Sequence, residues 1–319
     1  MSNKVKQEMD QIEIPKEVSE RSKMGIAQAK DEMRKERKSL PMKGIGIAAA
    51  LAITLGTYML WSNGFGPNES ADSPNQVEVT EDGGVVIPAL ELPENTETVT
   101  ADMIGLIVYN GKIYTQTATE ISSEAAKAMV GEKLGTTKGS IDEWSEQEAY
   151  EEEFASTVGV AEVYSVKGYD KDFRIMTYAE SGGEIYAEFF ENVNGFTVYS
   201  GADVFGKLNL TGNISEVQYR TYSDWNNSID QFHPIEDTEL VNGFVEELNN
   251  AKPLPRSQNS DPIGTSRSEE QFKEVSLYLN DGSVVRLILL KEGYIYYGFV
   301  PVYFEMSEDV FNRMWDQME

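Results

Sequence analysis

The sequence predicts an α+β protein: one transmembrane helix followed by a domain of antiparallel β-meanders packed with a few helices. Three observations lead to this fold class. An uncharged apolar stretch separates a basic N-terminal segment from an acidic remainder. Beyond it, short runs of β-branched and aromatic residues flank turn dipeptides such as Asn110-Gly111 and Asp281-Gly282, which favour hairpins. A few other stretches carry apolar residues at helical spacing.

The composition excludes several classes of site. The 319 residues include 27 Lys and Arg, 54 Asp and Glu, one His and no Cys. Without Cys there are no disulfides, thiolate nucleophiles or zinc-thiolate sites, and one His excludes sites that need two imidazoles. A sequence pI near 4.4 argues against a nucleic-acid partner, because phosphate binding needs clustered Lys and Arg.

The charge is distributed unevenly along the chain. Residues 1–43 carry 11 basic and 8 acidic residues, residues 44–68 carry no charge, and residues 69–319 have a net charge of about −30. We therefore expect a transmembrane helix over 44–61, which reaches about 27 Å and nearly matches a hydrocarbon core of ~30 Å.

The flanks of this stretch predict its orientation. Lys43 before it, and Tyr58 and Trp61 at its far end, are the expected membrane anchors. The basic flank places the N-terminus in the cytoplasm and the acidic remainder outside, as in a single-pass protein of the cell membrane with an extracellular C-terminal domain. A cleavable signal peptide is the alternative, but its basic region would be long and no Ala-x-Ala site follows. A buried core helix is the other alternative.

Residues 1–43 are expected to hold a cytoplasmic amphipathic helix. Pro15 suits a helix start, and apolar residues recur after it at helical spacing. The functional interpretation is a partner-binding surface that orders on contact. Its expected members are Ile14, Pro15, Lys16, Val18, Ile26 and Met33. The alternative is a charged juxtamembrane stalk without a partner.

The segment Ile14-Pro15-Lys16-Glu17, followed by a basic helical stretch and one expected span, resembles the N-terminus of certain Gram-positive anti-sigma factors. The resemblance covers the first 45 residues or so and rests on this four-residue motif and the topology. It implies that the cytoplasmic segment binds an extracytoplasmic-function sigma factor, and so a role in signal transduction and transcription regulation. It does not extend to the outer domain.

The remaining chain is expected to form a linker and two α+β subdomains. Residues 62–100 have the composition of a flexible acidic linker, with Val85–Ile87 as one short strand inside it. Residues 101–230 predict a hairpin, then a helix within 121–134, then a meander of strands over 161–166, 173–178, 185–190 and 196–200.

Residues 231–319 predict the second subdomain. A helix over 237–248 precedes a long loop and a hairpin around Asp281-Gly282. The C-terminal helix is expected to begin after Ser307, a suitable N-cap, and to pack Phe311 and Trp315 onto the sheet.

No catalytic, cofactor or metal site is expected, and the protein is not expected to be an enzyme. His233 is not accompanied by a Gly-x-Ser-x-Gly motif that could present a nucleophile. Asp170 and Asp172 lack the spacing of a calcium-binding loop and suit a hairpin corner instead.

Each of two features has two interpretations. The acidic run 146–154 is either a solvated helix face or a binding surface for a cationic or cell-envelope ligand. Tyrosines 294, 296 and 297, with Phe299 and Tyr303, form either core or a ligand platform. Alternate residues of a strand point to opposite faces, so at least part of this set is core.

Two functions follow from these expectations. The first is an anti-sigma-like membrane regulator with an acidic extracytoplasmic sensor or binding domain. The second is a membrane-anchored extracytoplasmic binding or scaffold protein with no transcriptional role.

Overall fold

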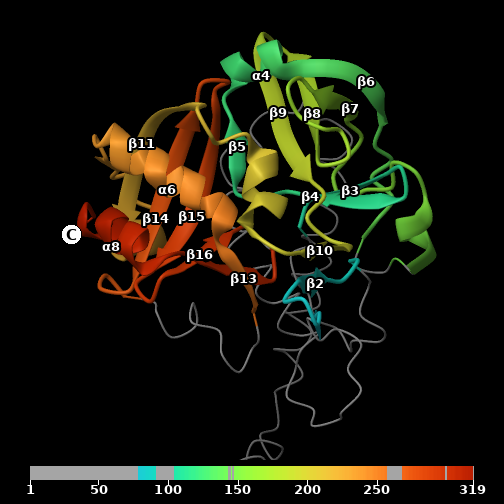
Figure 1. Cartoon of the computed structure of the whole chain (residues 1–319). Coiled ribbons are helices and arrows are strands. Elements are labelled where there is room, and N and C mark those ends of the chain that lie inside the picture. The colour runs from blue at the N-terminus through green and yellow to red at the C-terminus, as the bar shows by residue number, and fades with distance from the viewer. Residues whose placement is uncertain are drawn as a thin grey trace, which may run out of the picture. The chain divides into compact units, whose positions relative to one another are not determined.

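The computed structural model describes residues 78–90, 104–142, 145, 147–256, 268–298 and 300–318. These residues all fall within one compact unit. The fold is α+β, as the sequence predicts, with antiparallel sheets and few helices (Figure 1). The expected cytoplasmic helix within 1–43 and the expected span over 44–61 lie outside the described residues. Within the described part, no helix has the length and apolar character needed to cross a membrane.

The first large sheet, called here the N-terminal sheet, is built from two hairpins and two further strands. Asn110-Gly111 forms the expected turn of the first hairpin, and both residues have positive φ, at 53° and 69°. Its strands in spatial order are β3 (Leu106–Tyr109), β4 (Lys112–Thr115), β9 (Glu184–Glu191), β8 (Arg174–Ser181), β7 (Glu162–Val166) and β6 (Val130–Thr136).

The helix expected within 121–134 is present and ends before Gly131. It is α4 (Ser123–Met129), capped by the Ser122 side chain, and the residues after it form the edge strand β6. A Cβ at Gly131 would overlap Ser165, and one at Gly135 would overlap the Phe154 ring. These glycines let the chain approach its neighbours closely as a strand.

The second large sheet, the C-terminal sheet, contains the hairpin around Asp281-Gly282 as expected. Its strands in spatial order are β12 (His233–Pro234), β11 (Ile214–Thr221), β14 (Phe272–Leu279), β15 (Ser283–Leu290), β16 (Tyr294–Tyr297), β17 (Val302–Glu305) and β13 (Lys252–Pro255), and β5 (Thr119–Ile121) also pairs with β15. Apart from β5, the strands of the N-terminal sheet end at residue 191 and those of the C-terminal sheet begin at residue 214.

Two helices cover one face of the C-terminal sheet and contact each other (Figure 1). They are α6 (Thr238–Asn250) and α8 (Glu308–Asp316), close to the two helices that the sequence predicts. Ser307 occupies the expected N-cap position of α8, and Phe311 and Trp315 are buried against the sheet. A short helix, α5 (Tyr222–Asn226), follows β11 and has no counterpart in the sequence prediction.

A small third sheet brings part of the expected linker into the fold. Its strands are β1 (Glu78–Val79), β2 (Val85–Ile87) and β10 (Phe196–Val198). Val85 and Ile87 are at most 1% exposed and join the apolar core of the C-terminal sheet. Residues 78–90 are therefore folded rather than flexible, because β2 pairs with β10 and points alternate apolar side chains inward.

We expect Ile87→Ala to lower the free energy of unfolding by about 2–5 kcal/mol, because it removes buried methyl groups from the main core. Val79→Ala is the matched control, since Val79 lies in the same segment but is 51% exposed. Urea denaturation of both variants measures the difference. Equal, small effects of the two changes would show that residues 78–90 do not pack on the domain in solution.

Candidate functional site

The residues expected to bind a cytoplasmic partner and to anchor the membrane span lie outside the described residues. They stay predictions, and they are Ile14, Pro15, Lys16, Val18, Ile26, Met33, Lys43, Tyr58 and Trp61.

The polar candidates within the described residues have local structural contacts. The His233 ring stacks on Tyr219, with 5.1 Å between ring centroids. In the β7–β8 corner, Asp170 accepts a hydrogen bond from the backbone N–H of Asp172, whose carboxylate pairs with Lys112 at 3.0 Å. In the part of the chain that the structure describes, no group of three or more His, Cys, Asp or Glu residues is placed to hold a metal ion.

The acidic run 146–154 is more structured than a solvated helix face. Residues Gln147–Glu151 form a short 3-10 helix in which Tyr150 is buried. Glu152 pairs with Lys138 at 2.7 Å, and Glu153 accepts from the backbone N–H of Asn110 at 2.9 Å. The run thus has a basic partner, which the sequence alone did not reveal.

The tyrosines of β16 divide between the two faces of the sheet, as strand alternation requires. Tyr297 is fully buried on the helix-covered face. Tyr294 and Tyr296 lie on the other face, each about 6 Å from the Tyr303 ring. Phe299 lies outside the described residues.

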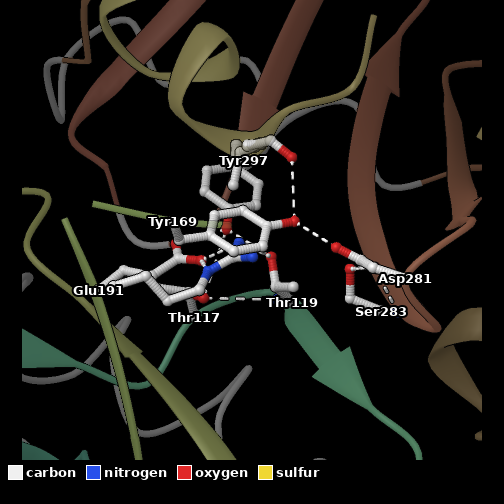
Figure 2. Close-up of polar contacts among 9 residues, drawn as sticks. Thr117, Thr119, Tyr169, Glu191, Asp281, Ser283 and Tyr297 are labelled. Carbon is white, nitrogen blue, oxygen red and sulfur yellow. Dashed lines mark hydrogen bonds and ion pairs between the residues drawn. The ribbon is translucent and has the colours of Figure 1, made fainter. Parts of the chain in front are cut away.

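A buried polar cluster joins the two large sheets and is the candidate functional site (Figure 2). It brings together two side chains of the N-terminal sheet and a tyrosine from the loop before β8. The other side chains come from β5, from the segment just before β5, from β16, and from the turn between β14 and β15 with the start of β15. We call it the junction network. Its members are Thr117, Thr119, Tyr169, Arg174, Glu191, Asp281, Ser283 and Tyr297.

The centre of the junction network is an ion pair with no solvent exposure. Arg174 on β8 lies directly opposite Glu191 on β9, and its Nε donates to Oε1 of Glu191 at 2.9 Å. The guanidinium also lies over the ring of Tyr169, 4.1 Å from the centroid, and near the Phe189 ring at 4.7 Å. These aromatic faces offset part of the cost of burying the cation.

Two hydroxyls close a ring of hydrogen bonds around this pair. The Tyr297 hydroxyl donates to Oε2 of Glu191 at 2.6 Å, and its oxygen lies 2.7 Å from Oγ1 of Thr119. Because Tyr297 has one proton to give, Thr119 donates to Tyr297 and in turn accepts from Nη2 of Arg174 at 3.4 Å. The ring therefore runs from Arg174 through both hydroxyls to Glu191.

A second contact between the sheets runs beside the first. The Tyr169 hydroxyl donates to Oδ2 of Asp281 at 2.7 Å, in the turn between β14 and β15. Ser283 donates to the other oxygen of Asp281 at 2.6 Å and so fixes its orientation. Figure 2 shows the Tyr169 ring pointing toward Asp281, with Ser283 beside it.

The protonation states are set by burial and by the neighbouring charges. Burial, and then Glu191, raise the pKa of Tyr297 well above its ordinary value. Burial is also the main reason that the pKa of Tyr169 rises to about 12. Burial alone would lower the pKa of Arg174, but Glu191 leaves it above the ordinary value. At neutral pH both tyrosines are therefore donors and Arg174 is a cation.

One atom of the junction network is left without a partner. Nη1 of Arg174 is buried and has no hydrogen-bond partner among the described residues. A buried donor in this condition costs about 1–3 kcal/mol. The network is thus incompletely satisfied, although it links the two sheets.

Sequence reasoning found only part of the junction network. Tyr297 was named within the tyrosine set, but Arg174, Glu191 and Tyr169 were not. A usable signal was present, because Arg174 lies in the apolar run 173–176 and Glu191 ends the apolar pair Phe189-Phe190. Opposite charges inside two apolar strands indicate a buried pair.

A small open cavity lies elsewhere on the described surface. It has a volume of about 210 Å³ and is formed where α6 passes the turn at Thr211 and Gly212. Asn242, Val245 and Glu246 complete its lining. These five lining residues do not place a nucleophile beside a general base.

Comparisons with known proteins add no relative. No protein-family model matches the sequence, and neither a curated protein nor a solved structure matches the chain. The site is therefore interpreted from its own geometry.

We expect Glu191→Gln to lower the free energy of unfolding by about 3–5 kcal/mol, because it leaves the Arg174 cation buried without a counter-ion. Glu162→Gln is a matched control, since Glu162 also accepts from a basic side chain and a tyrosine hydroxyl, but on the surface. That control should leave stability unchanged. Denaturant unfolding measures both variants, and equal effects would contradict a buried charge pair.

The raised pKa of Tyr169 predicts a loss of stability at high pH. Its folded value of about 12 lies above the ordinary 10.0, so its contribution is complete below pH 10 and is lost as pH rises from 10 to 12. Tyr169→Phe should therefore lose less stability than the unsubstituted protein between pH 8 and pH 11. Tyr199→Phe, at a tyrosine that is 54% exposed, should behave like the unsubstituted protein.

Proposed function

We propose that this chain is a single-pass regulatory protein of the cell membrane, similar in plan to anti-sigma factors. Residues 1–43 bind a sigma factor in the cytoplasm, and residues 44–61 span the membrane. The described α+β domain, in two subdomains, lies outside the cell as a sensor or binding domain. The protein has no enzymatic activity, no cofactor and no nucleic-acid partner in this proposal.

The distribution of charge carries the proposal. A basic segment, an uncharged stretch of membrane-spanning length and a remainder of about −30 net charge follow one another along the chain. The motif Ile14-Pro15-Lys16-Glu17 adds the resemblance to anti-sigma factors. A folded acidic domain after the span supports an outer binding role, since its field attracts cationic or cell-envelope ligands.

In the cytoplasmic helix, apolar and charged side chains would have different roles in binding. Burial of Ile14, Val18, Ile26 and Met33 supplies affinity, because each large apolar side chain contributes roughly 1.5–3 kcal/mol when fully buried. Ordering of the helix on contact offsets part of this gain. Charged neighbours such as Lys16 select the partner and set the association rate.

We expect the double change Ile14→Asp and Val18→Asp to weaken the sigma-factor complex at least about a hundredfold and to raise transcription from that factor's promoters. The control is Ser19→Asp, which adds one negative charge off the apolar stripe. Lys16→Glu should mainly change the salt dependence of association. A pull-down with residues 1–43 and a promoter reporter measure these effects.

The second candidate function is a membrane-anchored extracytoplasmic binding or scaffold protein. The acidic folded domain supports this second function as much as the first, because binding by that domain does not require a cytoplasmic partner. Deletion of residues 1–38 separates the two candidates. Unchanged transcription together with an altered envelope phenotype would contradict the anti-sigma proposal and leave the scaffold function.

A further inference from the structure

The two large sheets keep their apolar interiors apart. The clusters of the N-terminal sheet include Ile175 and Phe190 on one face, and Met176 and Phe189 on the other. The core of the C-terminal sheet is a separate cluster, which the N-terminal side joins at Phe173 and Val193, at the ends of β8 and β9. Ile121 of β5 packs in the cluster of α4. Apart from these apolar contacts the sheets meet through polar groups, and a boundary of this kind lets them move relative to each other.

The junction network divides its charges unequally between the sheets. Arg174 and Glu191 both belong to the N-terminal sheet, where they face each other across β8 and β9. The C-terminal sheet contributes the hydroxyl of Tyr297, and the Thr119 hydroxyl comes from β5, which pairs with β15. Separation of the sheets would therefore break hydroxyl contacts and leave the ion pair intact.

Opening of the junction would also restore the hydration of buried polar groups. Nη1 of Arg174, which has no partner among the described residues in the closed arrangement, would reach water. Both members of the ion pair would recover hydration that burial removes, and this desolvation cost is large for charges in a protein interior. These gains offset the loss of the Tyr297 and Tyr169 hydrogen bonds.

We propose that the junction network is a conformational latch between the two sheets. It is closed when the Tyr297 hydroxyl binds Glu191 and the Tyr169 hydroxyl binds Asp281. It is open when the sheets separate at this point with Arg174 and Glu191 still paired and hydrated. The inference rests on the geometry of the outer domain and holds whether or not the cytoplasmic segment binds a sigma factor.

The absence of native cysteine makes opening measurable in the full-length protein. Thr119→Cys places a thiol in the latch at a position that is 5% exposed, and Ser276→Cys places one at a 1% exposed position within β14. Under native conditions the Thr119→Cys thiol should react with a thiol reagent at least tenfold faster than the Ser276→Cys thiol. The Ser276→Cys thiol reports opening of the C-terminal sheet itself.

Tyr297→Phe tests the latch directly, because it removes the hydroxyl and keeps the ring in the core. In this background, labelling of Thr119→Cys should rise at least tenfold and labelling of Ser276→Cys should stay within twofold. Tyr164→Phe is the matched control, since Tyr164 donates to Glu162 within one strand and joins no two sheets. It should change neither rate.

Hydrogen exchange of the cysteine-free chain gives an independent measurement. Tyr297→Phe should speed exchange of the Thr119 amide at least tenfold, because this amide donates to Oγ1 of Thr117 beside the Tyr297 hydroxyl. Amides in the middle of β8 and β14 should keep their protection. Uniform loss of protection, or labelling rates that rise together at both thiols, would show that the junction opens only with global unfolding. Either result, or no change at all, would overturn the proposal.

Discussion

The buried pair of Arg174 and Glu191 is the constraint on which the arrangement of the sheets depends. Neither side chain has any solvent exposure, so each needs the other to remain charged in the interior. The pair also offers the acceptor that Tyr297 requires, and Tyr297 is held in turn by the core of the C-terminal sheet. The Tyr297 hydroxyl thus links the second sheet to the ion pair of the first.

Local signals in the sequence account for much of the fold. The turns at Asn110-Gly111 and Asp281-Gly282, and the apolar spacing of α6 and α8, are decided by residues close together in the chain. Such features depend on backbone preference and on burial of one face, both readable from a short window. The α+β class follows from them.

Long-range contacts account for the rest. β6 forms a strand where Gly131 and Gly135 pack closely against residues of β7 and of the loop at Phe154. β11 was not predicted, since its alternation of polar and apolar residues is weak and it becomes a strand by pairing with β14. Likewise the junction network joins residues more than 170 positions apart, such as Thr119 and Tyr297. No window of the sequence contains both partners.

In the proposed topology, the folded segment 78–90 would set the length of the tether between the domain and the membrane. If the span ends at Trp61, only residues 62–77 separate it from the first folded strand. Sixteen residues extend to at most about 55 Å even when fully stretched. In the proposed topology the domain would therefore stay within about 55 Å of the bilayer surface.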